Sequence, residues 1–426
     1  MHPTLQSQAQ ESDGAVHAPA SPRRRFVRGL GPGLVSGASA NDPTTVGSLA
    51  VVGAATGYGL AWLVVLLLPM LASIQAIAAS VAAVSEMSLQ QAITRTYGRV
   101  PAIISAAAIV SVGVLTLAAD VQAGAQALKL LCGVPFYYFI VPLVVVAGWL
   151  LATKSYLRIE RILASLTLIF LCYVASAILA RPDWGAVVRG ILVPHFDLSP
   201  AFAGGAIALL GTTLTGYVYF WESIEVAERR PGSSQLRAVN TDAVLGMLVA
   251  GSSFLFILIA TAATSERHNL IVQSAADAAV ALKPLAGSLD QMLFGLGLLA
   301  SAAIAVPVIA ATNGYVVAQT FHWRAGLALR PNEARSFYNV IFASLAIAAV
   351  LAFFPIPTMS LLYWVSVISG LATPLTLIFT MLVARNVTVM RGRPIPAPLT
   401  CAGWVVTAVV TLSSLAFIWS LIQYSY

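Results

Sequence analysis

One aspartate is the first candidate among the residues that could carry chemistry. Asp42 lies in the run Ser39–Thr45 (sequence SANDPTT), which interrupts a long apolar stretch. Pro43 has no amide hydrogen and its ring clashes with the preceding turn, so a helix should break here. A carboxylate beside backbone carbonyls that such a break frees is typical of a cation site. The alternative is that Asp42 caps the helix that follows, and the two roles are compatible.

A second interruption lies in the run Gly211–Tyr217 (sequence GTTLTGY), again inside an apolar stretch. The polar side chains at the two interruptions carry oxygen donors, and neither run contains His, Cys or Met. They are Ser39, Asn41, Asp42, Thr44 and Thr45 at the first interruption, and Thr212, Thr213, Thr215 and Tyr217 at the second. An all-oxygen site with one carboxylate is typical of a hard cation such as Mg²⁺, Mn²⁺ or Ca²⁺. The threonines could instead only satisfy backbone groups or let helices approach closely.

Further acidic residues are candidates for an ion pathway. Asp120 lies late in an apolar run, where it could shuttle protons, repel the wrong ion or hydrogen-bond to a neighbouring helix. Glu222 and Glu225 share a helix face because they are three residues apart, and Glu228 follows. This face is either a helix end neutralised by its own arginines or an acidic vestibule that attracts cations. The candidate pathway residues are Asn41, Asp120, Tyr217 and Glu222.

The composition of the chain indicates a membrane protein. Of its 426 residues, 59% are hydrophobic and 9% are charged, with a mean hydropathy of +0.87. A soluble domain carries roughly a quarter charged residues, so a typical cytosolic enzyme, a secreted disulfide scaffold and a disordered chain are excluded. The 3 cysteines are widely spaced, and no phosphate loop or nucleophile–base pair occurs. Neither an enzyme nor a resident cofactor is indicated.

Hydropathy predicts eleven membrane helices within residues 29–426. They span 30–57, 60–84, 101–127, 135–152, 156–180, 201–228, 242–263, 285–318, 336–354, 359–385 and 400–423. If spans 1–5 and 6–10 are repeats, both interruptions fall in the first helix of a half, and the eleventh helix is an addition. Paired interrupted helices at corresponding positions indicate the central site of a transporter.

The basic residues predict which side of the membrane each loop faces. With the N-terminus in the cytoplasm, all of the 23 Lys and Arg residues lie inside except Lys129, Arg181, Arg189, Arg267 and Lys283. We therefore expect an integral protein of a bacterial inner membrane, with a cytoplasmic N-terminus and an external C-terminus. Residues 1–28 are polar and contain an arginine cluster, and we expect a disordered cytoplasmic leader there. The net charge of +7 follows from the same bias and does not require nucleic acid.

Motifs along the chain resemble a known family. Gly31–Leu34 followed by Asp42-Pro43, and the stretch Ala119–Leu128, resemble the first and third spans of the Nramp family of divalent metal transporters. The similarity is closer to the Nramp-related magnesium transporter branch. The motifs that carry it are Gly211–Thr213 and Tyr217–Trp221 in the sixth span, Ala305–Ala310 and Tyr315–Ala318 in the eighth, and Leu362–Trp364 in the tenth.

The resemblance implies an all-α polytopic membrane protein of the leucine-transporter type, a 5+5 inverted repeat plus an eleventh helix, with helices 1 and 6 broken. It implies a metal bound between these two helices by Asp42 and by the carbonyls of Ser39 and Thr212. The family's Asn and Met ligands correspond to Thr45 and Thr215 here, and the absence of the Met also marks the magnesium branch.

Two departures from the family concern proton coupling. The family's Pro-His pair corresponds to Gly216-Tyr217, and its third-span acid for proton passage corresponds to Ala123. We therefore expect a secondary transporter of Mg²⁺ and/or Mn²⁺ that works by alternating access with little or no proton coupling. The metal is its substrate, and the lipid bilayer its other partner. The alternatives are a proton- or sodium-coupled carrier of a small organic solute, such as an amino acid or amine, and a sensor that does not transport.

Overall fold

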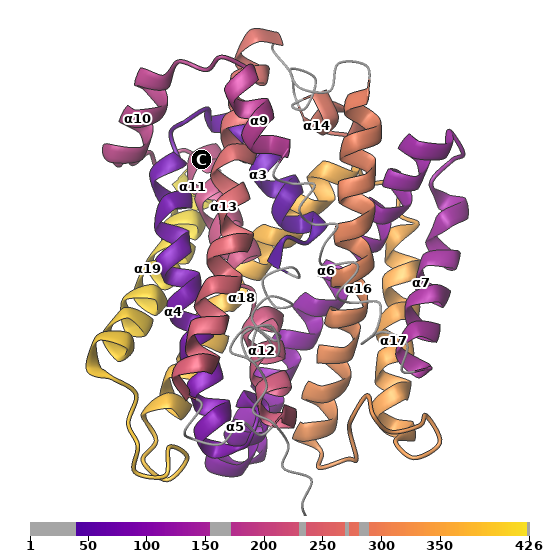
Figure 1. The fold of residues 1–426 in the computed structure, drawn as a ribbon, viewed down its shortest axis with the longest axis vertical. Coiled ribbons are helices and arrows are strands. Elements are labelled where there is room, and N and C mark those ends of the chain that lie inside the picture. The colour runs from indigo at the N-terminus through magenta and orange to yellow at the C-terminus, as the bar shows by residue number, and fades with distance from the viewer. Residues whose placement is uncertain (1–39, 154–171, 230–235, 269–271, 281–288, 424–426) are drawn as a thin grey trace, which may run out of the picture.

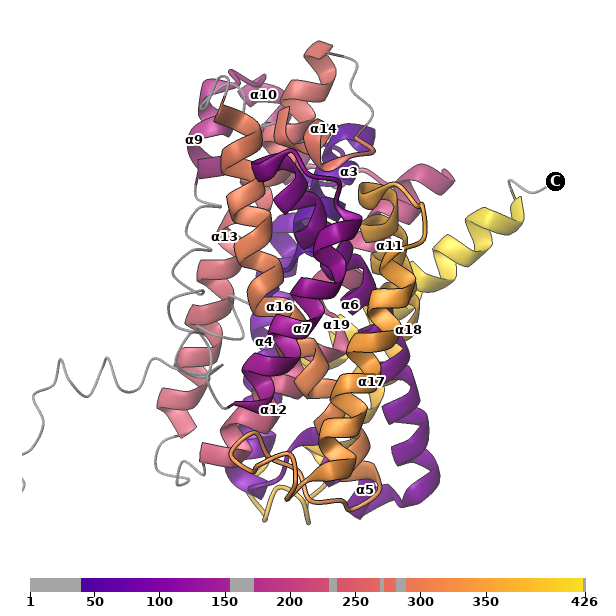
Figure 2. The same cartoon turned by 90° about the vertical axis from the view of Figure 1, so that its right-hand side faces the viewer.

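The computed structural model describes residues 40–153, 172–229, 236–268, 272–280 and 289–423. Within these residues all regular structure is helical, and 8 helices are long and apolar enough to cross a membrane. The long helices form an upright bundle with short helices at both ends (Figures 1 and 2). We call one end the α5 end, after α5 (Leu89–Tyr97), and the other the α10 end, after α10 (Trp184–Leu192). The short α14 (Ala275–Ala279) also lies at the α10 end.

The long helices coincide with the spans predicted from hydropathy. Seven of them are α4 (Ala61–Ser85), α6 (Arg99–Cys132), α13 (Leu236–His268), α16 (Asp290–Thr320), α17 (Arg335–Ala352), α18 (Thr358–Arg385) and α19 (Ala397–Gln423). The eighth is the run Pro200–Arg229, and the shorter apolar helix α7 (Tyr137–Ala152) matches the fourth predicted span. Of the fifth predicted span, the described part includes α9 (Cys172–Leu179). The expected leader 1–28 and the first part of the first span lie outside the described residues.

Both predicted helix interruptions are present. The helix α3 (Pro43–Thr56) begins directly after Asp42. The sixth span consists of α11 (Pro200–Thr213) and α12 (Gly216–Arg229), separated by Leu214 and Thr215. This second break is shorter than the run Gly211–Tyr217 suggested, because the first three residues of that run continue α11 to its end.

The segment between the second and third spans differs from expectation. The predicted spans 60–84 and 101–127 leave residues 85–100 as a connecting loop. Instead, Ser88 starts α5 with a capping box whose other member is Gln91. Glu86 ends α4 in the left-handed conformation, with φ 59°, and its carboxylate pairs with Arg391 at 2.8 Å. A hydropathy profile detects long apolar runs, so it does not reveal a short helix whose sequence signal is a capping box.

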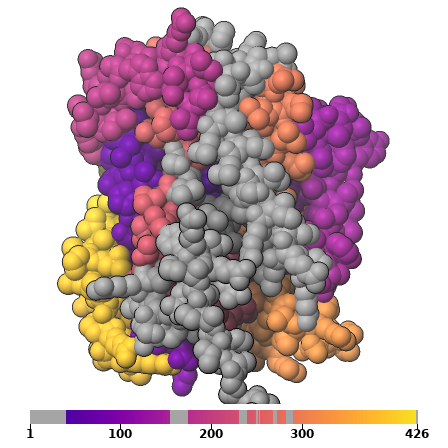
Figure 3. Space-filling model, in the orientation of Figure 1, coloured from indigo at the N-terminus to yellow at the C-terminus, as the bar shows by residue number. Residues whose placement is uncertain are grey.

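The helix α3 lies inside the bundle, enclosed by α13, α18 and α11 (Figure 1). The helices α6 and α16 form an extensive interface beside it. The helix α19 packs against α18, α11 and α4, but leans away from the bundle toward its C-terminal end (Figure 2). In the space-filling view α7 and α19 form opposite flanks (Figure 3). The position of α19 on one flank agrees with a helix added to a ten-helix core.

Two glycines let α11 and α18 approach closely. A Cβ atom on Gly211 would lie 2.1 Å from the carbonyl oxygen of Ser366 and 2.2 Å from the amide of Gly370. A Cβ atom on Gly370 would lie 2.4 Å from the carbonyl oxygen of Ile207. Small residues at such crossings are typical of packed membrane helices. Because backbone atoms fill the space, a side chain at either position must separate the helices.

We expect Gly211→Ala to destabilise the protein by about 1–3 kcal/mol, since the methyl group has no flexible neighbour to displace. The measurement is the midpoint of thermal unfolding in detergent. Gly148→Ala is the matched control, because its nearest neighbours are side-chain atoms of Phe342 and Leu345 at 3.3–3.6 Å. Equal midpoints for the two variants would contradict this account of the crossing.

Candidate functional site

The Asp42 side chain caps the N-terminus of α3 and lies at the centre of the candidate site. Its Oδ1 accepts a hydrogen bond of 2.7 Å from the Thr45 amide, and Pro43 occupies the first helical turn, where its missing amide hydrogen is not needed. Asp42 is 1% exposed. The capping role that the sequence suggested is therefore real, and it uses only one of the two carboxylate oxygens.

The second break reaches the other oxygen of this carboxylate. The hydroxyl of Tyr217, in the first turn of α12, donates a hydrogen bond of 2.8 Å to Asp42 Oδ2. Residues 175 positions apart in the sequence are thus joined at one acid. Asp42 and Tyr217, which the sequence placed at a metal site and on an ion pathway, belong to the same site.

Threonine hydroxyls connect the two breaks a second time. Thr45 Oγ1 and Thr212 Oγ1 are 2.9 Å apart, and Thr212 Oγ1 also donates to Thr44 Oγ1 at 3.4 Å. All three threonines are buried. Two of the predicted ligands, Thr45 and Thr212, therefore lie face to face beside Asp42.

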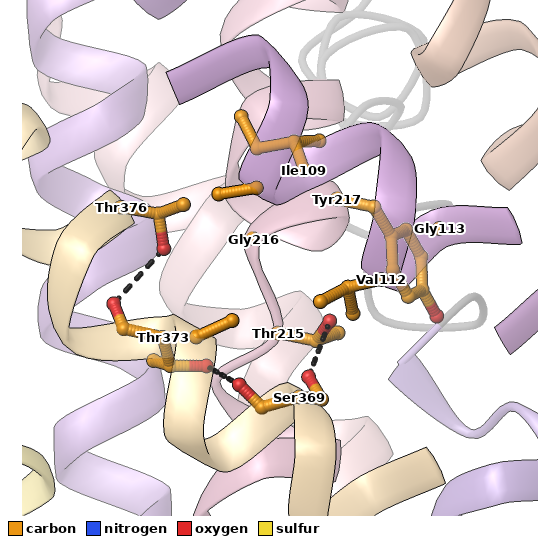
Figure 4. A pocket seen from close by; sticks show the side chains of 11 residues that line it. Ile109, Val112, Gly113, Thr215, Gly216, Tyr217, Ser369, Thr373 and Thr376 are labelled. Atoms are coloured by element: carbon orange, nitrogen blue, oxygen red, sulfur yellow. Dashed lines mark hydrogen bonds between the residues drawn. The ribbon is translucent and has the colours of Figure 1, made fainter. Parts of the chain in front are cut away.

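Thr215 is oriented differently from the other predicted ligands. Its hydroxyl accepts a hydrogen bond of 3.1 Å from Ser369 of α18 (Figure 4). It lines a cavity of about 10 Å³ together with Gly113, Tyr217 and Thr376. A space of this size holds about one water molecule. Thr215 lies at the break, as predicted, and its hydroxyl is hydrogen-bonded to α18.

Asn41 is held by two helices that the sequence did not connect with the site. Its Oδ1 accepts a hydrogen bond of 3.2 Å from Ser253 of α13. Its carbonyl oxygen accepts one from the Ser301 hydroxyl of α16. These bonds fix the chain just before Asp42. Ser39, the remaining predicted ligand, lies outside the described residues.

Asp120 of α6 lies near Asp42. It is fully buried, and it interacts electrostatically with the Asp42 carboxylate and with the backbone of Thr44. Two buried acids near each other repel when both are ionised, so a cation between or beside them is favoured. Asp120 thus lies at the central site, and the roles that the sequence suggested for it stay predictions.

The glutamates of α12 extend from the centre of the bundle toward the α5 end. Glu222 is buried, and Glu225 lies 3.9 Å from Arg229. Glu228 accepts a hydrogen bond of 2.5 Å from the Tyr315 hydroxyl. Glu228 and Tyr315 line a cavity of about 690 Å³ at this end of the bundle. Glu225 thus lies near an arginine of its own helix and Glu228 lines a cavity, and the neutralised helix end and the acidic vestibule both stay predictions.

The helix α18 was predicted as a membrane span, but its contacts with the site were not predicted. Ser366 of α18 accepts a hydrogen bond of 2.7 Å from Ser48 of α3, and Ser369 donates one of 2.8 Å to the Gly211 carbonyl of α11. These side chains belong to a buried polar stripe at alternating spacings of three and four residues, a pattern that follows one helix face. Its members are Ser366, Ser369, Thr373, Thr376 and Thr380. The spacing is visible in the sequence.

The chemistry of the site follows from its donor set. Within the part of the chain that the structure describes, no group of three or more His, Cys, Asp or Glu side chains is arranged to hold a metal. The site offers one carboxylate with a second nearby, several hydroxyls and the backbone at two helix breaks. Such oxygen atoms suit a hard cation.

Comparison with known proteins gives the family. The family model described as "Natural resistance-associated macrophage protein-like", Nramp, matches residues 33–420. The divalent metal cation transporter MntH of Mycobacterium tuberculosis is 27% identical over 402 residues, which cover 92% of this chain and 91% of the relative. MntH of Deinococcus radiodurans is 27% identical over 419 residues, which cover 95% and 92%.

Solved structures show the same fold. A manganese transporter of Eremococcus coleocola superposes with a TM-score of 0.77 at 19% identity, over 94% of this chain and 88% of that chain. MhsT in complex with L-phenylalanine superposes with a TM-score of 0.62 at 14% identity, over 92% and 98%. These likenesses confirm the all-α fold of the leucine-transporter type. The curated relatives are metal transporters and not enzymes, and the metal is their cargo rather than a cofactor. The chain belongs to the Nramp family.

Proposed function

We propose that this protein is a secondary transporter of divalent metal cations, with Mg²⁺ and/or Mn²⁺ as substrate, and that it works by alternating access. The observation that carries the proposal is the buried Asp42 carboxylate, which accepts hydrogen bonds from the Thr45 amide at one helix break and from the Tyr217 hydroxyl at the other. The names of the curated relatives, divalent metal cation transporters, support the same substrate class.

The proposed ligands are Asp42, the hydroxyl oxygens of Thr45 and Thr215, and the backbone carbonyls of Ser39 and Thr212. The set contains no thioether or imidazole, because Thr215 and Tyr217 occupy the positions where the family resemblance places Met and His. Soft ligands favour later transition metals, whereas carboxylate, carbonyl and hydroxyl oxygens favour Mg²⁺ and Mn²⁺. This donor set supports the magnesium branch of the family.

Transport requires the described arrangement to open. The bonds Thr45–Thr212 and Tyr217–Asp42 join the two breaks directly, so a cation entering between them replaces both. The bond from Tyr315 to Glu228 holds α16 to α12 near the cavity at the α5 end. Rearrangement of these contacts would expose the site to one side of the membrane at a time.

The cavity beside Thr215 bears on the organic-solute alternative. It holds about 10 Å³, whereas pockets for organic ligands measure about 300 Å³ or more. The likeness to MhsT, whose structure contains L-phenylalanine, concerns the fold alone. The space at the break is therefore suited to a small ion with few waters.

We also propose how the chain lies in the membrane. Arg95, Arg324, Arg385 and Arg393 belong to the α5 end, whereas Arg189 lies on α10 at the other end. Because basic loops remain in the cytoplasm, the α5 end faces the cytoplasm. This places the N-terminus inside and the C-terminus outside in a bacterial inner membrane.

The first prediction concerns Asp42→Asn. We expect this variant, reconstituted in proteoliposomes, to take up Mn²⁺ and Mg²⁺ at a rate more than about tenfold lower than that of the unchanged protein. The reason is that a neutral amide cannot compensate the charge of a dehydrated cation. Asn is as good a helix cap as Asp, so α3 should still begin at Pro43.

The matched control is Asp197→Asn, since Asp197 is exposed and accepts hydrogen bonds from Ser199 before α11 begins. We expect its uptake to equal that of the unchanged protein. Undiminished uptake by Asp42→Asn would end the proposal that this carboxylate binds the substrate.

The second prediction concerns proton coupling. Ala123 occupies the α6 position where the family resemblance places an acid for proton passage, and it is buried. We expect metal uptake into proteoliposomes without acidification of the lumen, measured with an enclosed pH dye. Uncoupled entry carries net positive charge, so an inside-negative potential should accelerate it. Acidification in proportion to metal uptake would show that protons are carried.

The third prediction concerns Tyr217→Phe. The Tyr217 hydroxyl donates to the oxygen of Asp42 that the Thr45 amide does not use, so it competes with a cation. A hydrogen bond to a charged group contributes about 1.5 kcal/mol or more, so its removal should tighten Mn²⁺ binding about tenfold by calorimetry.

The control is Tyr219→Phe, because the Tyr219 hydroxyl is also buried but is hydrogen-bonded to Thr376 Oγ1 of α18, at 2.5 Å. We expect unchanged Mn²⁺ affinity there. Weaker binding by Tyr217→Phe would show instead that the phenol oxygen is a ligand.

A further inference from the structure

A cavity of about 620 Å³ lies where α18 is joined to α19, away from the central site. Its wall includes the last turn of α18, the connecting residues 386–396 and the first turns of α19. The residues that matter are Arg385, Met390, Arg393, Ile395 and Trp404. Since α18 and α19 are both long and apolar enough to cross a membrane and the cavity lies between their adjoining ends, we expect it near the membrane surface.

Two arginines of this cavity, Arg385 and Arg393, differ in their charge partners from Arg391, which lies between them in the sequence. Arg391 pairs with Glu86 at 2.8 Å and also donates to the Ser85 carbonyl. Arg385 and Arg393 are exposed, and in the described part of the chain neither forms an ion pair with a carboxylate. The cavity therefore has positive charge that no described acidic side chain neutralises.

A second and independent observation is a buried donor. The indole Nε1 of Trp404 lines the same region and is buried without a hydrogen-bond partner among the described residues. The indole N–H of a buried tryptophan ordinarily finds an acceptor. An acceptor in the cavity would satisfy it.

The remaining wall is apolar. Met390 and Ile395 are buried beneath the cavity, and Val387 at its edge is 73% exposed. A free phosphate ion gains nothing from such a wall, whereas an acyl chain does.

We propose that this cavity binds an anionic phospholipid. Its headgroup phosphate pairs with Arg385 and Arg393, and a turn of the Trp404 ring toward the cavity lets Nε1 donate to it, while an acyl chain covers Val387. Both arginines are suited to phosphate because the guanidinium group donates two parallel hydrogen bonds. The lipid joins the eleventh helix to the end of the tenth.

The test is native mass spectrometry of the full chain in detergent, titrated with phosphatidylglycerol or with phosphatidylcholine of the same acyl chains. We expect phosphatidylglycerol to bind more tightly. The double variant Arg385→Gln/Arg393→Gln should weaken this binding about thirtyfold, from about 1 kcal/mol for each arginine at a membrane surface. Trp404→Phe keeps the ring but not the donor, and should weaken it between about two- and tenfold.

The control is Arg324→Gln/Arg330→Gln, which removes the same charge from exposed positions between α16 and α17 at the same end. We expect this control to retain its affinity. Equal weakening in both double variants, or equal affinity for the two lipids, would overturn the proposal.

Displacement of phosphatidylglycerol by millimolar inorganic phosphate would also overturn it, since the site would then belong to the free anion. If the arginine variant does not fold, Trp404→Phe decides, and unchanged phosphatidylglycerol binding there overturns the proposal.

Discussion

The burial of the Asp42 carboxylate is the constraint on which the rest of the site depends. An ionised group taken out of water costs several kcal/mol unless hydrogen bonds and nearby charges compensate it. Here one oxygen is satisfied by the Thr45 amide and the other by the Tyr217 hydroxyl. The first bond requires α3 to begin at Pro43, and the second requires α12 to begin beside it. One charge therefore fixes where two helices start and that they face each other.

Helices outside the two breaks hold this arrangement through many weak bonds. Ser366 and Ser369 of α18 connect to Ser48 of α3 and to the Gly211 carbonyl of α11, and Ser301 of α16 holds the Asn41 carbonyl. Polar bonds between membrane helices contribute only about 0.6 kcal/mol each on average. Each contact can thus be exchanged at small cost, while together they define one conformation. A protein that alternates between two conformations needs contacts of this kind.

Much of the fold could be predicted from the sequence, because membrane helices are long and apolar and both breaks contain residues that disfavour a helix. Asp42 and the threonines follow from the same local signals. The bond between Tyr217 and Asp42, and the closeness of Asp120, could not be predicted, since they depend on how distant helices pack. The stripe from Ser366 to Thr380 was visible as a spacing, but nothing in the spacing tells which helices it contacts. The helix α5 was missed because its signal is a capping box and not an apolar run.

The hydroxyl groups explain how one set of atoms serves both the empty and the occupied site. A hydroxyl oxygen is a donor through its hydrogen and an acceptor through its lone pairs, and the hydrogen can rotate. In the described conformation Tyr217 donates to Asp42, and the hydroxyls of Thr45 and Thr212 share a hydrogen bond. A cation at the carboxylate would displace the Tyr217 hydroxyl and turn the Thr45 hydrogen away, which leaves the Thr45 oxygen toward the metal. A lysine or arginine at these positions could satisfy Asp42 equally well, but its fixed positive charge would exclude the cation.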